Sequence, residues 1–272
     1  MLRPGTGDPV VFLHPVGGEV LCYGELARVL PGDYPVYALA ADDALRTASA
    51  PVLTDLAAHN LRRLRCAGLS PRMLAGWSFG GMLAFEMARL LMADGPACPV
   101  TVIDTMPFQR GDRPPRAVLI EAFAADLVRA AGHRPEEAGF DAGLWALPPS
   151  EAVVHLHGHL ERHGMPLGLG ADELLDRARI YMNAFSALQS HRPAGHGPPV
   201  HVLWATRTAT DPLVWWQRVS SEPVGGAAIE ADHYSLLRQP VVHRVSRLLH
   251  EQVASRTMVD PLTTETTDGS HR

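Results

Sequence analysis

The first part of the chain alternates short, continuous apolar runs with longer stretches in which apolar positions recur at helical spacing. Strands are predicted at 8–15 (DPVVFLHP), 35–41 (PVYALAA), 71–77 (PRMLAGW) and 98–105 (CPVTVIDT). Helices are predicted between them, at 17–30, 51–68 and 81–95. Uninterrupted apolar strands separated by helices are typical of a parallel sheet that is covered on both faces. The carboxyl ends of such strands lie at one edge of the sheet.

The alternation stops after Thr105 and returns only near the carboxyl end. Between residues 106 and 199 no strand pattern is found, and helices are predicted at 117–132, 150–164 and 172–191. Strands are predicted again at 199–206 and 226–232, followed by a closing helix at 239–254. The pattern therefore predicts an α/β core built from 1–105 and 200–256, a helical lid insertion at 106–199, and a disordered polar tail at 257–272.

Composition and charge exclude several classes of protein, but they do not indicate which reaction or ligand the chain is built for. The 272 residues carry a formal net charge of −5 and scattered arginines, so no basic face for nucleic acid is indicated. The first residues, MLRPGTGDPVVF, lack the regions of a signal peptide, and no apolar stretch reaches the length of a membrane helix. The three cysteines are far apart and form no C-x-x-C pair, which argues against a zinc site or a disulfide framework. We expect a cytoplasmic protein that binds neither nucleic acid nor membrane.

The strongest chemical signal is the pentapeptide Gly76-Trp77-Ser78-Phe79-Gly80, which joins the predicted strand 71–77 to the predicted helix 81–95. A G-x-S-x-G serine between a strand and a helix is typical of a nucleophile elbow, a sharp turn that exposes the hydroxyl above the sheet edge. Glycine is needed on both sides because bulkier residues do not fit so tight a turn. The helix that follows directs its unpaired N–H groups and its positive dipole end toward the serine. Ser78 is therefore the predicted nucleophile.

A serine nucleophile needs a base, and the base needs a third group that fixes its tautomer. On α/β-hydrolase sheets the chain order is Ser, then Asp or Glu, then His. Asp104 ends the predicted strand 98–105 at the same sheet edge as Ser78, so it is the predicted acid. Asp211, after the strand 199–206, is the alternative acid. His233, between the last strand and the closing helix, is the predicted base.

The loop His14-Pro15-Val16-Gly17-Gly18 follows the first strand, and its two glycines allow the backbone to approach a ligand closely. Hydrolases of this kind place one oxyanion N–H in this loop and the other on the residue after the nucleophile. We therefore expect Val16 and Phe79 to supply the oxyanion N–H groups. The alternative is a plain strand-to-helix turn, and His14 is expected to brace the loop in either case.

The chain has 14 histidines, and three of them form the pattern His155-x-His157-x-His159. This spacing suits metal ligands on a strand, but these residues fall in a predicted helix. Alternate residues of a helix diverge by about 200°, so the three side chains cannot face one ion. They are interpreted as solvated or packing residues of the lid, and no metal is expected.

In combination, HPVGGEVLCYGELARVL, GWSFGGMLAFEMARLL, VIDT and ADHYSLL resemble the thioesterase domain that closes nonribosomal peptide synthetases and related polyketide hybrids. The resemblance covers residues from about Leu2 to Val253 and includes RIYMNAFSALQSHRP, which looks like the last lid helix of that family. It implies Ser78 as acyl acceptor, His233 as base, Asp104 as the residue that orients it, and Val16 and Phe79 as oxyanion donors. One departure is Ala231, where the family commonly has glycine.

The resemblance also implies the chemistry. A carrier protein presents a peptidyl or acyl thioester on its phosphopantetheine arm, Ser78 accepts the acyl group, and hydrolysis or macrocyclisation releases it. No cofactor bound by the chain itself is expected. The alternatives are a stand-alone editing thioesterase that clears short acyl groups, a general serine esterase and a binding module without catalysis. The segment LRPGTGDP at the start looks like a linker from an upstream domain.

Overall fold

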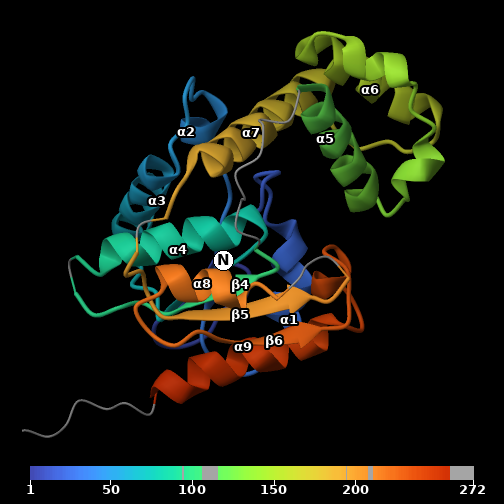
Figure 1. The fold of residues 1–272 in the computed structure, drawn as a ribbon. Helices are drawn as coiled ribbons and strands as arrows, with labels where there is room; N and C mark the ends of the chain where they lie inside the picture. The colour runs from blue at the N-terminus through green and yellow to red at the C-terminus, as the bar shows by residue number, and fades with distance from the viewer. Residues whose placement is uncertain (94, 106–115, 194, 208–210, 258–272) are drawn as a thin grey trace, which may run out of the picture.

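Six parallel strands form the central sheet of the molecule (Figure 1). The computed structural model describes residues 1–93, 95–105, 116–193, 195–207 and 211–257. The strands are β1 (Val10–Leu13), β2 (Val36–Leu39), β3 (Met73–Trp77), β4 (Val100–Ile103), β5 (Val200–Ala205) and β6 (Gly225–Ile229). They lie in the order β2-β1-β3-β4-β5-β6, and every neighbouring pair is parallel. All their carboxyl ends therefore meet at one edge, as the strand pattern predicts.

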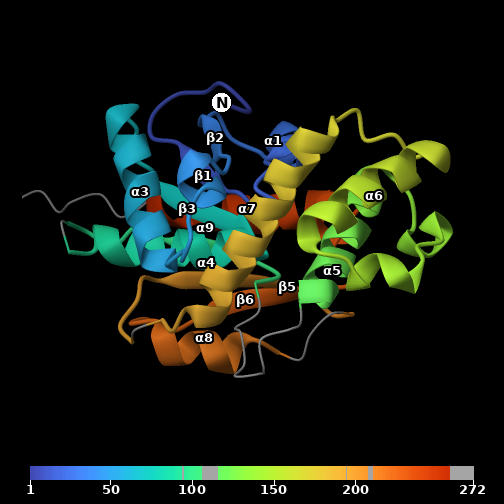
Figure 2. The ribbon, with the colours of Figure 1, turned by 90° about the horizontal axis from the view of Figure 1, so that it is seen from above.

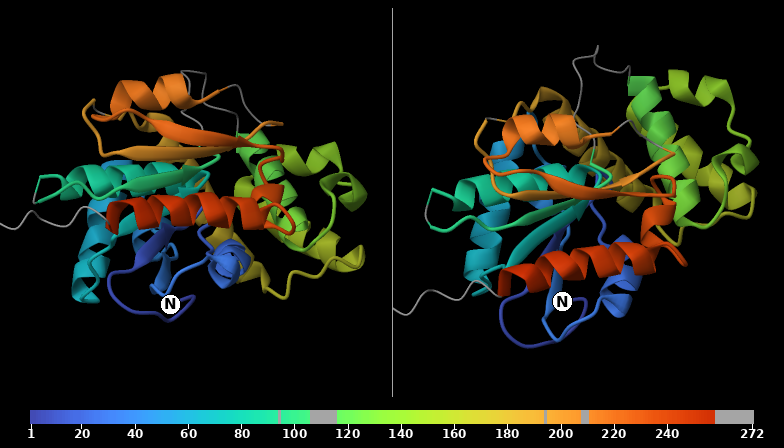
Figure 3. Two further views of the ribbon diagram at one scale, coloured as in Figure 1. Left: turned by 90° about the horizontal axis from the view of Figure 1, so that it is seen from below. Right: turned by 60° about the horizontal axis from the view of Figure 1, so that its bottom comes forward.

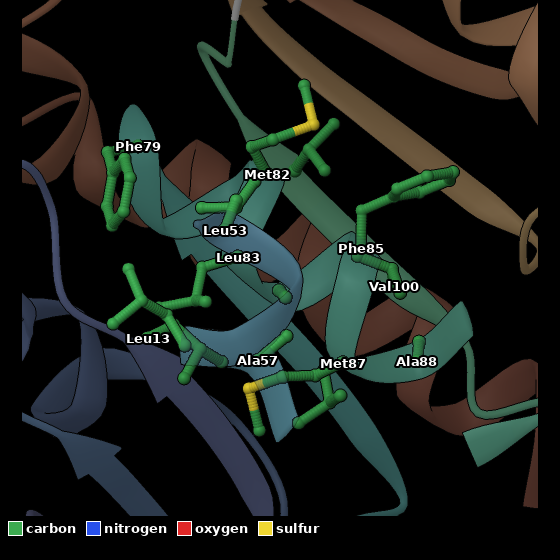
Figure 4. Packing of buried hydrophobic residues seen from close by; sticks show 14 of the residues in the cluster. Leu13, Leu53, Ala57, Phe79, Met82, Leu83, Phe85, Met87, Ala88 and Val100 are labelled. Atoms are coloured by element: carbon green, nitrogen blue, oxygen red, sulfur yellow. The ribbon is translucent and has the colours of Figure 1, made fainter. Parts of the chain in front are cut away.

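Helices cover both faces of this sheet, which explains why the central strands β1, β3 and β4 are almost completely buried. In β1, Val10 and Phe12 face one layer of helices, and Val11 and Leu13 face the other. The first layer contains α1 (Gly24–Val29) and α9 (Val242–Thr257), and Figure 3 shows α9 lying along this face. The second contains α3 (Leu53–Cys66), α4 (Phe79–Leu91) and α8 (Leu213–Val219). Figure 4 shows the packing of this second layer, with α4 side chains against β1 and β4.

The chain between β4 and β5 contains three long helices with an apolar core of their own. These are α5 (Arg116–Ala130), α6 (Pro149–Arg162) and α7 (Ala171–Ser190). Phe123, Leu156 and Leu174 are among the buried residues of this separate cluster. Figures 1 and 2 show α5 and α6 standing beside the sheet, while α7 runs back toward α3 and α4. We call α5, α6 and α7 the lid helices. Residues 106–115, which begin the predicted insertion, lie outside the described residues.

Several elements differ from the sequence prediction. The helix predicted at 17–30 begins only with a 3-10 turn, η1 (Leu21–Tyr23), and continues as α1, because Gly18 adopts a positive φ of 82°. Two short helices, α2 (Asp43–Arg46) and α8, were not predicted, nor were the 3-10 turns η2 (Pro135–Ala138), η3 (Ala142–Ala146) and η4 (Ser235–Leu237). The prediction that the chain is disordered from 257 onward is wrong at Thr257, which still belongs to α9. Residues 258–272 lie outside the described residues.

The first residues are bound to the edge of the sheet. The backbone N–H groups of Leu2 and Arg3 donate to the carbonyl oxygen of Val36, at 2.8 and 3.2 Å, and the N–H of Val36 donates to Arg3. The guanidinium of Arg3 donates to the carbonyl oxygens of Leu30, Gly32 and Tyr34. The segment whose composition suggests a linker is therefore docked onto β2.

Candidate active site

Ser78 lies in the turn between β3 and α4, with a backbone conformation (φ 58°, ψ −126°) that residues other than glycine seldom adopt. The neighbouring glycines are required because backbone atoms occupy the space of their side chains. A Cβ on Gly76 would lie 2.1 Å from the carbonyl carbon of Gly80, and a Cβ on Gly80 would lie 2.2 Å from the carbonyl oxygen of Leu13. The G-x-S-x-G pattern is thus a packing requirement of this turn. Ser78 faces a cavity at the carboxyl edge of the sheet.

Asp104 and His233 form a hydrogen-bonded pair at the same edge. Nδ1 of His233 lies 2.6 Å from Oδ2 of Asp104, whose side chain is fully buried. The other carboxylate oxygen, Oδ1, accepts a hydrogen bond of 2.9 Å from the backbone N–H of Ala205. Because a carboxylate only accepts hydrogen bonds, Nδ1 carries the ring proton of the neutral histidine and Nε2 has a free lone pair. His233 and Ser78 line the same cavity, so this arrangement suits a base that acts on the serine.

Trp77, the residue before the serine, holds the backbone of His233. Its indole N–H donates to the carbonyl oxygen of His233 at 3.0 Å, and the two rings lie against each other with centroids 4.6 Å apart. The backbone N–H of Trp77 donates to the hydroxyl of Tyr23, which donates in turn to the carbonyl oxygen of Leu13. The elbow and the histidine are therefore joined by one side chain, and the elbow is joined to β1 by another.

Asp232 shapes the loop that carries His233. Its Oδ1 accepts hydrogen bonds from the backbone N–H groups of Tyr234 and Ser235, at 3.0 and 2.9 Å. The hydroxyl of Ser235 accepts from the N–H of Asp232 at 3.0 Å. Although partial burial opposes the charge, the hydrogen bonds from this turn lower the pKa of Asp232. Ala231, which replaces the glycine expected from the resemblance, is buried and keeps a negative φ, so its methyl group fits this loop.

Val16 and Phe79 lie on two segments beside the serine. Val16 is in the loop after β1, and Phe79 directly follows Ser78. Val16 lines the cavity, in a turn closed by a hydrogen bond from the N–H of Gly18 to the carbonyl oxygen of Pro15. Phe79 is the first residue of α4, where the N–H groups of a helix have no partner within the helix. Its buried ring stacks on His14, with centroids 5.6 Å apart, so the two loops are packed together.

His14 is a structural residue of this edge. Burial lowers the pKa of His14 to about 4, so the imidazole is neutral at neutral pH. Its Nδ1 lies 2.9 Å from the carbonyl oxygen of Pro15 and therefore carries the proton that it donates there. These contacts agree with the bracing role expected for His14.

The cavity has a volume of about 470 Å3 and separates the sheet edge from the lid helices. Trp77, Ser78 and His233 form its floor, while Phe123, Leu127 and Tyr181 supply an apolar wall from α5 and α7. Charged residues also line it, among them Asp126 and Arg129 on α5. A largely apolar cleft over a few polar reactive groups suits a substrate with an acyl chain.

The alternative acid lies elsewhere. Asp211 is exposed, and its Oδ1 accepts a hydrogen bond of 2.8 Å from the backbone N–H of Leu213 at the start of α8. It does not contact His233, whose ring nitrogen is engaged by Asp104. The structure therefore brings Asp104 rather than Asp211 to the histidine.

The histidines of the H-x-H-x-H pattern hold the lid together. Nε2 of His157 lies 2.8 Å from the carbonyl oxygen of Leu169, and Nε2 of His159 lies 2.6 Å from that of Ala138. His155 is exposed on the same helix. Over the described ranges, no group of three His, Cys, Asp or Glu residues is placed to hold a metal ion. Among the helices described, none is both long enough and apolar enough to span a bilayer.

Sequence reasoning named the reactive groups but missed the residues that hold them. Trp77, Tyr23, Tyr234 and Asp126 were given no role, because their contacts join segments far apart in the chain. Asp232 had a local signal, because an Asp side chain in a loop often accepts a hydrogen bond from the backbone N–H two residues further on. The others have no comparable signal.

Comparisons with known proteins identify the family of the chain. The thioesterase domain family model matches residues 8–253. A nonribosomal peptide synthetase, btyA, of Aspergillus terreus (strain NIH 2624 / FGSC A1156) is 27% identical over 94% of this chain, which spans 29% of that protein. A dimodular nonribosomal peptide synthase of Bacillus subtilis (strain 168) is 29% identical over 70% of this chain and 8% of that protein. The chain thus spans less than a third of these curated relatives.

Solved structures give the same assignment. The Vlm2 thioesterase domain is 25% identical, covers 92% of this chain and 95% of its own, and has a TM-score of 0.66. A four-domain nonribosomal peptide synthetase, holo-AB3403, matches 95% of this chain over 20% of its own with a TM-score of 0.78, and at 22% identity it bears on the fold alone. The predicted α/β-hydrolase fold is therefore confirmed. The chain belongs to the thioesterase domain family.

Proposed function

We propose that this thioesterase domain releases a peptidyl or acyl chain from a carrier protein through an acyl-enzyme on Ser78. The observation that carries the proposal is the His233–Asp104 pair, which lines one cavity with a serine held on a strained elbow. The family supports hydrolase chemistry on thioesters, and these three residues supply the groups that such chemistry needs.

In the first transfer, Nε2 of His233 takes the proton of the Ser78 hydroxyl while Oγ attacks the thioester carbonyl. The C–S bond of the resulting tetrahedral intermediate then breaks, and the histidine returns the proton to the departing sulfur. Asp104 keeps Nδ1 protonated and stabilises the imidazolium that forms between these events. The products of this step are a seryl ester and the free thiol of the phosphopantetheine arm.

The backbone N–H groups of Val16 and Phe79 are the proposed oxyanion donors. Phe79 supplies an N–H of the first turn of α4, and Val16 lies in the neighbouring loop that the His14–Phe79 contact holds in place. Each such donor typically contributes about 3 kcal/mol to transition-state stabilisation.

In the second transfer, Nε2 of His233 takes the proton of the nucleophile that attacks the ester carbonyl. The C–O bond to Ser78 then breaks, and the histidine passes this proton to the departing Ser78 oxygen. Water gives a free acid, and an amine or hydroxyl of the acyl chain gives a ring. The apolar wall formed by Phe123, Leu127 and Tyr181 limits access of water to this ester and gives the chain a surface against which to fold. This wall is the reason to propose cyclisation beside hydrolysis.

The partner that delivers the substrate is proposed to be a peptidyl or acyl carrier domain. The support is the multidomain architecture named for the relatives, of which this chain covers only a part. No cofactor of the chain itself takes part in the two transfers, because the phosphopantetheine belongs to the carrier.

Intact-protein mass spectrometry after mixing with a peptidyl thioester mimic tests the proposal, with Ser78→Ala as control and the products followed in the same samples. We expect an acyl adduct on Ser78 in the wild type and none in the variant. Reaction with short acyl thioesters but not with peptides would favour the editing thioesterase, and reaction with free esters alone would favour a general esterase. An unchanged adduct in Ser78→Ala would overturn the assignment of the nucleophile.

A further inference from the structure

The lid helix α5 is joined directly to the loop that carries His233, residues 231–238, which we call the histidine loop. The hydroxyl of Tyr234 donates a hydrogen bond to Oδ1 of Asp126 on α5 and accepts one of 3.1 Å from Nη1 of Arg129. The guanidinium of Arg129 also lies over the Tyr234 ring, 4.4 Å from its centroid. A second connection runs from Arg238 to the carbonyl oxygen of Arg129, at 2.9 Å. The lid and the histidine loop therefore share a cluster of polar contacts centred on Tyr234.

Tyr234 also packs against the reactive histidine. Its ring meets the ring of His233 edge-on, with centroids 5.2 Å apart, and meets Trp77 in the same way at 5.9 Å. His233 is held on its other side by the Trp77 ring, and its carbonyl oxygen accepts the indole N–H. A movement of Tyr234 therefore changes the packing around the imidazole.

The surroundings of Asp126 make its contact with Tyr234 costly to break. Burial raises the pKa of Asp126, opposed by hydrogen bonds from Tyr234 and Tyr181 and by the charge of Arg129. Burial also raises the pKa values of Tyr234 and Tyr181, so both hydroxyls are protonated donors at neutral pH. Asp126 and Tyr234 are both half-buried, so a group that loses its partner there regains water only in part. The Asp126–Tyr234 contact therefore constrains the position of α5.

We propose that Tyr234 is a positioning residue that couples the lid to catalysis: its contacts with Asp126 and Arg129 hold α5 over the cavity and, in the same position, hold the imidazole of His233 in place for Ser78. This inference rests on the proposed function, because it needs His233 to act on Ser78. Opening of the lid then requires release of the Tyr234 hydroxyl, and the histidine loses one of its supports at that moment. Tyr234 also lines the cavity, but it takes no part in the proton transfer between Ser78 and His233, so the effect proposed for it here is indirect.

Two measurements on the whole chain test this coupling. The first is the rate at which a small fluorophosphonate labels Ser78, which depends on activation of the serine by His233. The second is hydrogen exchange of the backbone amides of α5 and of the histidine loop. The variants are Tyr234→Phe, which removes only the hydroxyl, and Asp126→Ala. The matched control is Tyr34→Phe, whose hydroxyl lies 3.2 Å from Nδ1 of His250, away from the cavity.

We expect Tyr234→Phe to lower the labelling rate by about tenfold, the cost of a modest misplacement of a catalytic group. Exchange is expected to rise in α5 and in the histidine loop together, with a melting temperature close to that of the control. We expect Asp126→Ala to change the labelling rate and the exchange in the same way as Tyr234→Phe. The double variant should show little further change, because both substitutions remove the same contact. Tyr34→Phe is expected to change neither readout.

Three outcomes would contradict the coupling: an unchanged labelling rate in Tyr234→Phe, a rise in exchange confined to one of the two elements, or fully additive effects of the two variants. Failure of the proposed function is separate from these. It would appear as wild-type protein that is not labelled, or as labelling that persists in Ser78→Ala. The exchange measurement needs no activity, so it decides whether the two elements move together even then.

Discussion

Asp104 offers a direct test of the site at the scale of single residues, because each of its carboxylate oxygens has one partner, His233 or the N–H of Ala205. Asp104→Asn keeps the shape but can present an amide N–H to Nδ1, which favours the wrong tautomer of the histidine. We expect kcat for thioester turnover to fall by roughly three to four powers of ten, with the fold intact. Asp211→Asn is the matched control, since within the described ranges the Asp211 carboxylate accepts from the N–H of Leu213 and does not reach His233. A larger loss in Asp211→Asn would mean that the wrong acid has been assigned.

Gly76 tests whether the elbow depends on packing. A Cβ at this position would lie 2.1 Å from the carbonyl carbon of Gly80, so Gly76→Ala must displace the backbone of the elbow. We expect the free energy of unfolding to fall by about 3 kcal/mol or more, at the upper end of the cost of overpacking. Gly158→Ala is the control, because a Cβ there meets nothing within 4 Å and Gly158 lies inside α6. That change is expected to stabilise the protein slightly. Similar urea midpoints for the two variants would contradict the packing argument.

His14 makes the stability of the fold depend on pH. Its pKa is lowered to about 4 in the folded state by burial, whereas an unfolded histidine titrates near 6.5. Between these values the unfolded chain binds more protons than the folded chain. Stability is therefore complete above about pH 6.5 and is lost as the pH falls toward 4, by up to about 3 kcal/mol for this residue. The same burial effect lowers the pKa of His201 to about 4, so it contributes in the same window.

Unfolding by urea at a series of pH values between 4 and 7 measures this dependence. Between pH 7 and 4, we expect the free energy of unfolding to fall less in His14→Gln than in the wild type. The loss that remains in this variant comes in part from His201. His243→Gln, at an exposed position of α9, serves as the control and should keep the full slope. An unchanged slope in His14→Gln would show that the buried imidazole is not the cause.

The residues that meet at this sheet edge were found from sequence because each lies in a local pattern. Ser78 is framed by glycines that its own turn requires, and Asp104 ends an apolar strand whose direction the fold fixes. The residues that hold them could not be predicted. Tyr234 acts through Asp126, which is 108 positions away along the chain. No local sequence pattern indicates which aromatic residue will contact which helix.

At the scale of elements, one of the contacts that anchor the lid is a buried hydrogen bond made by the residue after α7. Nε2 of His191 lies 2.9 Å from Oε1 of Glu86 on α4, and Nε of Arg89 lies 2.7 Å from Oε2. Burial opposes the charge on Glu86, but the hydrogen bonds from His191 and Arg89 outweigh it and lower the pKa of Glu86. His191→Ala leaves one oxygen of a fully buried carboxylate without this partner. We expect a loss of about 1–3 kcal/mol in the free energy of unfolding.

The control for this anchor is the exposed pair Arg134–Glu137, which has a comparable distance of 2.7 Å. Glu137→Gln should change the free energy of unfolding by less than about 1 kcal/mol, because exposed pairs are screened by water. Equal losses in His191→Ala and Glu137→Gln would mean that burial does not strengthen the α7 anchor.

Elements were predictable where their pattern is long or buried on both faces. All six strands were found, because continuous apolar runs between helices admit few other interpretations. The helix α2 and the helix α8 were missed because four and seven residues are too few to show a period. The start of the helix predicted at 17–30 was wrong because Gly18 adopts a positive φ, a backbone choice that apolar spacing does not encode.

At the scale of the whole molecule, the lid helices turn the sheet edge into a cleft with an apolar wall. Phe123 on α5 and Tyr181 on α7 contact each other there, with ring centroids 5.4 Å apart, and both face the cavity. If this wall keeps water from the acyl-enzyme, its loss should affect the second transfer more than the first. Phe123→Ala is therefore expected to raise the share of hydrolysed product severalfold, with a smaller change in the rate of Ser78 acylation.

The measurement is the ratio of cyclic to hydrolysed product from a peptidyl thioester, taken together with the single-turnover rate of acylation. Val154→Ala is the control, since Val154 lies on α6 of the same lid and is 49% exposed. If the wild type only hydrolyses its substrate, the same variant still tests this prediction. The deacylation rate of Phe123→Ala should then rise relative to its acylation rate. Equal effects on both steps would show that the wall binds the substrate without governing water. In that case the lid contributes affinity, and control of the product lies with the acyl chain itself.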